Sequence, residues 1–425
     1  MKAERNKINR RKFLKTVGAA GLGSVVAGCR AKKEKEPNTA EASSARAAQK
    51  DEYSQVPRRK LGRTGLKVPC LSFGGMFNLT DSQIILRKTL QYGIDYWDTA
   101  TVYTGSEAGI GKYLSKNPGV REKVFIVTKA LGAKNAAGME ERLQASMKKM
   151  NTKYVDLYYY HDLPDPALLT DEIRDWAESA KKRNLIRVFG FSTHKNMSKC
   201  LAAAASLDWI DAIMTVYNFR LIQDPNMQAA LEACYKAGIG LIAMKVQGTG
   251  PTAEWAGHTS KIETEADKKL VGHFLEQGFT EGQAKIKVVL EDKRISSACV
   301  TMQNIAVLTS NVAAVLDKTK LTKADIGVFK EYAEATCSSY CAGCADICDS
   351  TLPDALRPGR ISDIMRYLMY YNSYGDKARA RKLFAEIPSE VRSKLLSANY
   401  GPAEARCPQH LPIHRLVAEA ISKLA

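Results

Sequence analysis

Two absences narrow the functional classes open to this chain. The body of the sequence has no basic stripe interleaved with aromatic residues, although the formal net charge is +18. Residues 1–50 carry 13 Lys and Arg against four Asp and Glu, so half of the net charge lies there. The remaining charge is what a solvated surface carries, and we therefore expect no nucleic-acid partner. The apolar run at residues 16–28 is also too short to span a bilayer.

The N-terminal residues instead resemble an export signal. Residues 9–15 read NRRKFLK, and an apolar run of small residues leads from there to Cys29. This order resembles a twin-arginine signal over residues 1–29, which implies the twin-arginine export machinery as a partner. Residues 26–29, VAGC, also resemble a lipobox, which implies a lipid anchor at Cys29 and a periplasmic or cell-envelope location. A plain cleavage site is the alternative, and in both cases residues 30–56 are expected to form a flexible linker.

Short apolar runs recur along residues 57–320 and alternate with helix-like segments. Near-continuous apolar runs are typical of parallel strands that are covered on both faces. Eight such units in about 250 residues predict an α/β fold, a (β/α)8 TIM barrel. The rival is a doubly wound open sheet, but Phe73-Gly74-Gly75 poorly matches the glycine-rich phosphate turn after the first strand of such a sheet. The predicted strands span residues 68–75, 94–99, 123–130, 155–162, 186–192, 212–218, 238–245 and 295–302.

Four polar side chains lie at or just beyond the ends of consecutive predicted strands. Asp98 ends the second strand and is followed by Tyr103, while Lys129 and His161 come at the ends of the third and fourth. Taken singly, Asp98 suits a helix cap and His161 a buried core histidine, but in a barrel all four positions meet at the rim that carries the chemistry.

The chemistry of the four residues is coherent. A nearby ammonium favours a phenolate, and a carboxylate holds that lysine in place, so Tyr103 is predicted to be the general acid or base of carbonyl–alcohol interconversion, tuned by Lys129 and Asp98. His161 would orient the substrate oxygen. The reaction also needs a hydride, which no side chain supplies, and this implies a nicotinamide.

The same stretches resemble the aldo-keto reductase family. The similarity covers residues 57–320 and is carried by residues 59–75 (RKLGRTGLKVPCLSFGG), 95–114, 123–130 and 155–162. Asp98, Tyr103, Lys129 and His161 match the family's catalytic positions in their order. The resemblance implies a barrel that binds NAD(P)H in an extended form.

The resemblance also implies cofactor-binding residues, with departures from the family pattern. Met214 stands where a glutamine is usual, and Met244 where an aromatic residue commonly stacks on the nicotinamide, although a methionine sulfur can also pack against a ring. Val307 replaces the arginine that often grips the 2′-phosphate, so no preference for NADP over NAD is expected. The residues expected to bind the cofactor are Ser192, Tyr217, Asn218, Met244, Lys245 and Asn311.

Five of the ten cysteines follow the predicted barrel. Cys341, Cys344 and Cys348 resemble the first three ligands of one half of a two-cluster ferredoxin, but Leu352-Pro353 stands where Cys-Pro is expected. Cys407-Pro408 resembles the fourth place of a second half whose other cysteines are missing. Because the fourth cysteine of each half serves the cluster of the other half, the survivors predict one [4Fe–4S] cluster. Its ligands would be Cys341, Cys344, Cys348 and Cys407.

Three other interpretations of these cysteines remain open. A disulfide knot at residues 337–348 suits an exported protein. A zinc site would use Cys337, Cys341, Cys344 and Cys348. The first three of these also match the spacing of the triad in radical enzymes that use S-adenosylmethionine. Apolar positions recur at helical spacing over residues 361–388, so residues 321–425 are expected to form a small, mostly helical, ferredoxin-like region.

Together these features predict an exported oxidoreductase of aldo-keto reductase type with one [4Fe–4S] cluster. The expected substrate is a small carbonyl or alcohol, and a redox-active cluster would imply an electron-transfer partner. The loop at residues 248–269 is expected to border the pocket, where Trp255 or His258 would touch a ligand unless the loop is a mobile surface segment. The alternative is a non-catalytic or electron-transfer iron–sulfur lipoprotein that uses the barrel as a scaffold.

Overall fold

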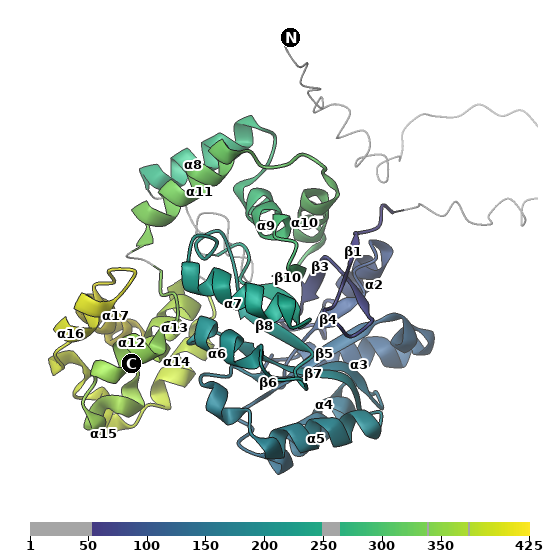
Figure 1. Cartoon of the computed structure of the whole chain (residues 1–425), viewed down its shortest axis with the longest axis horizontal. Coiled ribbons are helices and arrows are strands. Elements are labelled where there is room, and N and C mark those ends of the chain that lie inside the picture. Colours follow the sequence, from purple (N-terminus) through teal and green to yellow (C-terminus); the bar gives the residue numbers. More distant parts are fainter. Residues whose placement is uncertain (1–52, 249–263, 338–339, 373–374) are drawn as a thin grey trace, which may run out of the picture. The chain divides into compact units, whose positions relative to one another are not determined.

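Eight parallel strands close into a barrel in the computed structural model of the chain (Figure 1). The structure describes residues 53–248, 264–337, 340–372 and 375–425. The strands pair in the order β10-β3-β4-β5-β6-β7-β8-β9, and β9 pairs in turn with β10. The predicted (β/α)8 barrel is therefore confirmed. The N-terminal signal, Cys29 and the loop residues Trp255 and His258 lie outside the described residues.

Each predicted strand has a counterpart in the barrel. Nearly every strand residue is buried, because side chains fill the interior and helices cover the outer face. The near-continuous apolar runs of the sequence follow from this double cover. The strands are β3 (Leu71–Gly74), β4 (Tyr96–Asp98), β5 (Phe125–Leu131), β6 (Val155–His161), β7 (Ile186–Thr193), β8 (Ala212–Val216), β9 (Gly240–Met244) and β10 (Ile295–Thr301).

The first predicted strand, residues 68–75, was wrong in one respect, because the structure divides it in two. Its beginning, β2 (Lys67–Pro69), pairs antiparallel with β1 (Arg58–Lys60), and only β3 joins the barrel. Pro69 has no N–H to donate to a ladder, and the N–H of Cys70 donates to the carbonyl of Pro57 at 2.8 Å. Val68 of β2 packs with interior residues of the barrel. The hairpin formed by β1 and β2 therefore covers the amino-terminal end of the barrel.

The helices around the barrel begin at side-chain caps. Asn135, Thr170 and Asp224 each accept a hydrogen bond from a backbone N–H in the first turn of the helix that follows. These bonds satisfy N–H groups that have no partner inside the helix. Within the described residues, no helix is both long and apolar enough to cross a membrane. The helices are α2 (Gln83–Gln91), α3 (Ser106–Lys116), α4 (Ala136–Lys149), α5 (Asp171–Lys182), α6 (Met197–Ala204), α7 (Pro225–Lys236), α8 (Glu265–Glu276), α9 (Glu281–Glu291) and α10 (Ile305–Leu316).

The chain beyond the barrel is helical, as predicted, and builds a core of its own. The first helix, α11 (Lys323–Ala335), still packs on the barrel, where the ring of Phe329 lies 4.8 Å from that of Phe274. The later helices enclose a second apolar core that runs from Leu352 to Leu424 (Figure 1). They are α12 (Ala345–Cys348), α13 (Ile361–Asn372), α14 (Lys377–Ala385), α15 (Ser389–Arg392), α16 (Gly401–Arg406) and α17 (Ile413–Leu424).

Candidate active site

Three side chains from adjacent strands and one from the turn that follows β4 meet at the carboxyl end of the barrel. Asp98 ends β4, His161 ends β6, Lys129 lies within β5, and Tyr103 lies in the turn before α3. The amine of Lys129 lies 2.6 Å from Oδ1 of Asp98 and donates to the hydroxyl of Tyr103 at 3.5 Å. The rings of Tyr103 and His161 meet edge to face, with centroids 6.1 Å apart. The structure thus brings together all four residues that the sequence singles out.

Burial sets the charge state of this group. Lys129 is only 1% exposed, and burial lowers its pKa. The charge and hydrogen bond of Asp98, together with Tyr103 and Cys299, more than offset burial and raise the pKa overall, so the amine is charged. Burial raises the pKa of Tyr103 to about 12 against the opposing effect of Lys129, so the phenol is protonated at neutral pH. Burial, helped by Lys129, lowers the pKa of His161 to about 3, so the imidazole is neutral. The lysine therefore acts in the predicted direction, but burial is the larger effect.

Asp98, Tyr103 and His161 border a pocket with a cavity volume of about 110 Å³, whereas Lys129 is not among its lining residues. Its walls are mainly apolar with a few convergent polar groups, which is typical of a site for a small molecule. Two side chains, Tyr370 and Arg379, come from the C-terminal helices rather than from the barrel. The remaining wall comes from strand ends and loops of the barrel, namely Gly74, Met76, His194, Met214, Met244, Lys245, Val246, Gln247, Gly248, Cys299, Val300 and Thr301.

Only part of the predicted cofactor-binding set borders this pocket. Met244 and Lys245 do, and Asn218 lines a neighbouring cavity that it shares with Lys245. Ser192 is 1% exposed, and its hydroxyl accepts a hydrogen bond from the N–H of Asp162 at 3.1 Å. The serine thus supports the loop after β6, one residue beyond His161.

Asn311 lies behind the wall of the pocket. Its Oδ1 accepts a hydrogen bond from Nε2 of Gln247 at 3.4 Å, and Gln247 borders the pocket. The Nδ2 of Asn311 is buried and has no hydrogen-bond partner among the residues that the structure describes. A buried amide donor needs a partner, so this position fits a residue that contacts a bound nucleotide.

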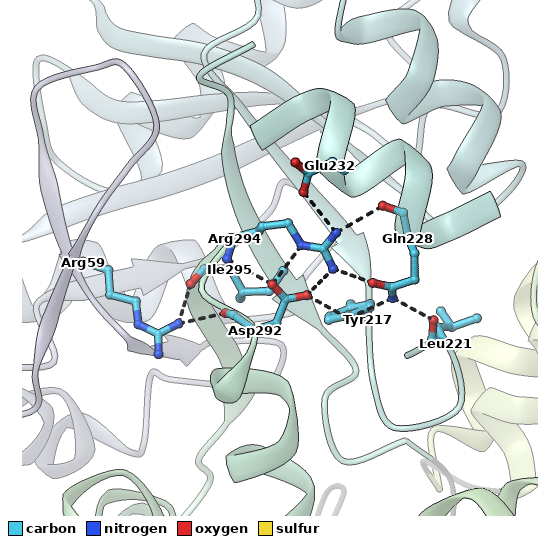
Figure 2. A network of polar contacts seen from close by, with 8 residues as sticks. All are labelled: Arg59, Tyr217, Leu221, Gln228, Glu232, Asp292, Arg294 and Ile295. Atoms are coloured by element: carbon cyan, nitrogen blue, oxygen red, sulfur yellow. Dashed lines mark hydrogen bonds and ion pairs between the residues drawn. The ribbon is translucent and has the colours of Figure 1, made fainter. Parts of the chain in front are cut away.

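Tyr217 is not among the residues that line the pocket, and its side chain belongs to a separate network of polar contacts (Figure 2). Its hydroxyl donates to the carboxylate of Asp292 at 2.9 Å and accepts from Nε2 of Gln228 at 3.1 Å. Arg294 completes this network by binding Asp292 at 2.7 Å and the carbonyl of Gln228 at 3.1 Å. The structure therefore does not bring Tyr217 to the site, and its contacts tie α7 to the start of β10.

The chain can be compared with known proteins on this basis. A family model described as "Aldo/keto reductase family" matches residues 71–334, which include all eight barrel strands, the four clustered residues and all but the last residue of α11. The chain belongs to the aldo-keto reductase family. Members of this family are NAD(P)-dependent oxidoreductases, and this aldo-keto reductase is an enzyme of that type.

Similar sequences extend over the barrel. This aldo-keto reductase is 23% identical over 287 residues to L-galactose dehydrogenase of Arabidopsis thaliana, covering 62% of this chain and 89% of that protein. It is 24% identical over 320 residues to L-glyceraldehyde 3-phosphate reductase of Escherichia coli, covering 65% of this chain and 92% of that protein.

Solved structures share the fold. A thermostable aldo-keto reductase crystallised with the inhibitor epalrestat aligns with a TM-score of 0.54 and 22% identity, over 65% of this chain and all of that one. An aldo-keto reductase of Bacillus halodurans in its holo form aligns with a TM-score of 0.53 and 20% identity, over 65% of this chain and 96% of that one. These likenesses support the barrel architecture.

The C-terminal region reaches the catalytic rim of this aldo-keto reductase through buried charges. Arg366 of α13 donates to Asp162 at 2.7 Å, and Asp162 directly follows His161. Burial raises the pKa of Asp162, but Arg366, His194 and Lys195 together outweigh burial and hold that pKa well below its usual range. Lys195, after β7, forms a second ion pair with Asp363 of α13.

Sequence reasoning missed Arg366 and Arg379 as site residues. Both lie in the stretch 361–388 that helical periodicity identified as a packing face. The available signal was the presence of arginines in a stretch whose apolar residues recur at helical spacing. The sequence does not indicate, however, which surface these helices contact.

A second cavity lies beside the catalytic pocket. His194, Lys245 and Gly248 border both spaces, and Asn218, Tyr340 and Arg366 line the second. The chain passes close to β7 here: Gly343 has φ +82°, and a Cβ at this position would collide with the carbonyl oxygen of His194. The glycine thus lets the cysteine-bearing segment pack directly on the barrel.

Four cysteines from distant parts of the sequence line a third, small cavity. Cys341, Cys344 and Cys348 border it together with Cys407, and Cys337 is not among its lining residues. Burial, followed by the charges of Cys341 and Cys407, raises the pKa of Cys344 to about 11. The cavity also adjoins the second cavity, because Cys341 borders both.

The state of these cysteines bears on the open interpretations. None of the nine described cysteines is in a disulfide, so the predicted alternative of a disulfide knot finds no support. The described part of the chain also shows no group of three or more His, Cys, Asp or Glu side chains arranged to hold a metal ion. In a four-iron cluster each cysteine binds its own iron, so its thiolates surround a volume rather than converge on one ion. Four thiols around one cavity, that of Cys407 buried and the other three half-buried, fit that requirement.

Proposed function

We propose that the protein interconverts a small carbonyl compound and its alcohol with NAD(P)(H), and that Tyr103 is the general acid in the reductive direction. The observation that carries the proposal is the buried pair of Lys129 and Asp98 beside the hydroxyl of Tyr103, with His161 on the other side of the phenol. A protonated phenol donates to the developing alkoxide of the substrate, and the ammonium stabilises the phenolate that remains.

The neutral histidine orients the substrate. Because the imidazole of His161 is neutral, one of its ring nitrogens carries a hydrogen and can donate to the carbonyl oxygen of the substrate. A neutral imidazole does not compete with Tyr103 as the proton donor. Its Nδ1 is buried and has no hydrogen-bond partner in the part of the chain that the structure describes. A nicotinamide, when bound, supplies or accepts the hydride. Met244, Lys245, Asn218 and Asn311 are the residues we expect to hold it.

Replacing Tyr103 with Phe tests the proposal. Loss of the proton donor is expected to lower kcat for aldehyde reduction about 10²–10⁴-fold, with little change in the affinity for NAD(P)H measured by fluorescence. Tyr235→Phe, at a tyrosine that is 52% exposed, is the matched control and should leave kcat unchanged. Wild-type kcat in the Tyr103→Phe enzyme would contradict the proposed role and favour a scaffold function for the barrel.

We also propose that Cys341, Cys344, Cys348 and Cys407 hold one [4Fe–4S] cluster. Their common cavity supports this, because Cys407 lies 59 residues beyond Cys348 and yet lines the same space. The exclusion of Cys337 from the lining residues argues against the predicted zinc site, which would use that cysteine. All four cysteines lie beyond the residues matched by the family model, so the cluster would be an addition to the aldo-keto reductase barrel.

A pair of cysteine variants tests the cluster. Cys407→Ser is expected to abolish the brown absorption and to lower the iron content of the anaerobically purified protein, because one of four thiolates is lost. Cys337→Ser is the matched control and should retain both signals. A four-iron spectrum that survives in Cys407→Ser but not in Cys337→Ser would identify Cys337 as the fourth ligand instead.

We further propose that the protein is exported in folded form and anchored through a lipid at Cys29. The order of twin arginines, apolar run and VAGC sequence supports this proposal, and so does a cluster that would be inserted before transport. Free nicotinamide is scarce outside the cytoplasm, so the nucleotide would be loaded inside and retained, and an electron-transfer partner would work through the cluster. A purified protein that is active but free of nucleotide would contradict this retention.

A further inference from the structure

The C-terminal helices place an arginine inside the catalytic pocket. Arg379, in the first turn of α14, borders the same pocket as Tyr103 and His161. Its guanidinium lies 4.7 Å from the centroid of the Tyr370 ring, which holds the side chain at the pocket wall. The neighbouring acid, Asp376, uses its carboxylate to cap α14 by accepting from the N–H of Arg379 at 3.3 Å. The arginine therefore borders the pocket, while the carboxylate of Asp376 caps the helix.

Arg379 brings to this pocket a positive charge that the neighbouring ion pairs do not use. Lys129 is balanced by Asp98, and Arg366 is balanced by Asp162. Among the residues that the structure describes, Arg379 forms no ion pair with a carboxylate. Lys245 borders the same pocket and lies near the same ring, with its amine 5.6 Å from the Tyr370 centroid, and it donates to the sulfur of Met369 at 3.8 Å. Burial, together with the charges of Arg366 and Arg379, lowers the pKa of Lys245 well below its usual value, and an anion between these groups would offset that repulsion.

We propose that Arg379, together with Lys245, binds an anionic group of the carbonyl substrate, a carboxylate or a phosphate. The inference rests on the proposed carbonyl chemistry and adds to it the substrate class. A guanidinium offers paired donors that match both oxyanions. The group would lie at the end of the pocket that the C-terminal helices close, so the region beyond the family match selects the substrate of the barrel.

Matched aldehydes test this assignment. Each pair consists of an anionic aldehyde and a neutral aldehyde of similar shape. para-Carboxybenzaldehyde, with a carboxylate, is compared with para-formylbenzamide, and glyceraldehyde phosphate is compared with glyceraldehyde. Arg379→Gln is expected to raise KM for the anionic aldehydes at least about tenfold, with kcat and the neutral aldehydes little affected. The pair in which Arg379→Gln raises KM for the anionic member more strongly identifies the preferred anion, carboxylate or phosphate. Arg379→Lys should recover part of the loss, and Arg381→Gln, on an exposed arginine of the same helix, should change nothing.

A binding measurement keeps the inference separate from the proposed function. Titration calorimetry of para-carboxybenzyl alcohol with NADPH present uses a pair that cannot react, so it does not depend on turnover. Weaker binding in Arg379→Gln, with unchanged binding of the neutral amide alcohol, supports the anion site even if the wild-type protein reduces no aldehyde. Equal loss for charged and neutral compounds would overturn the inference. So would a lost affinity for NADPH, because Arg379 would then serve the cofactor.

Discussion

At the scale of single residues, the site separates the charge that tunes the reaction from the group that transfers the proton. Lys129 is buried and fixed by Asp98, so its ammonium cannot move toward solvent when the charge on Tyr103 changes. Burial nevertheless dominates the phenol and keeps it protonated over the physiological range. In the proposed mechanism, Tyr103 would therefore be a proton donor that is always loaded in the reductive direction and would need its lysine mainly after the proton has left.

The pH dependence of the reaction follows from these pKa values. Reduction needs the protonated phenol, which is present below the pKa of Tyr103, about 12. His161, with a pKa lowered to about 3, stays neutral above that value. We therefore expect kcat for reduction to be constant between about pH 6 and about pH 9, whereas oxidation, which needs the phenolate, should become faster as the pH rises.

Steady-state profiles in both directions provide the measurement. An inflection in kcat near the ordinary histidine pKa of about 6.5 would contradict the expectation. If such an inflection occurred and disappeared in His161→Asn, the histidine would titrate in the working range, and burial would not control its charge.

At the scale of elements, the end of β6 has two functions. Its last residue, His161, faces the catalytic pocket, and the next residue, Asp162, binds Arg366 of α13. The side chains of this pair are only 11% and 19% exposed, so removal of one partner leaves a charge that water solvates poorly. Breaking such a pair is costly, whereas replacing both partners can be nearly neutral.

We expect Arg366→Met to lower the free energy of unfolding by about 3 kcal/mol, because Asp162 loses its partner. Asp162 has a depressed pKa, so its contribution is present above its unfolded pKa of about 3.9 and is lost as the pH falls below that value. Urea unfolding at neutral and acidic pH measures both effects.

The double variant Asp162→Asn/Arg366→Met should recover part of this loss, because no unpaired charge remains. Arg174→Met removes the exposed pair with Asp171 and is the matched control, with an expected change within about 0.5 kcal/mol. A loss in Arg366→Met no larger than in this control would show that the bridge does not hold α13 on the barrel.

The strands and the residues at their ends were predictable because they depend on local pattern. Apolar runs located all eight barrel strands, and the barrel geometry then placed Asp98, Lys129 and His161 on one rim. The pairing of Cys407 with three cysteines far upstream followed from the ferredoxin resemblance, and the four line one cavity. The split at Cys70 was not predictable in this way, because an apolar run does not show where one strand ends and another begins.

Contacts between distant segments were not predictable. Periodicity shows that α13 and α14 have a packing face, but it does not show what that face meets, so Arg366 and Arg379 were missed. The assignment of Tyr217 followed a family motif, whereas its hydroxyl lies 2.9 Å from Asp292 and the residue does not line the pocket. The position of the Tyr217 side chain depends on the direction in which it leaves the backbone after β8, and a sequence motif does not specify this direction.

At the scale of the whole molecule, the N-terminal residues and the enzyme can be separated experimentally. Lysine at both Arg10 and Arg11 is expected to keep the protein in the cytoplasm, because the twin-arginine pair is the part of the signal that the export machinery recognises. Cell fractionation with immunoblotting measures the outcome, and Cys29→Ala should be exported but released from the membrane fraction. Unchanged export of the double lysine variant would contradict the twin-arginine assignment.

The ion pair at the end of β6 also limits how this protein can be divided. A chain cut after α11 would keep every strand, the proton donor and its lysine, yet it would leave Asp162 without its partner next to His161. It would also remove Tyr370 and Arg379 from the pocket wall. The segment that matches the family is therefore not a module that can be excised and expected to work. Grafting the C-terminal region onto another barrel would need the acid after β6 as well as the helices.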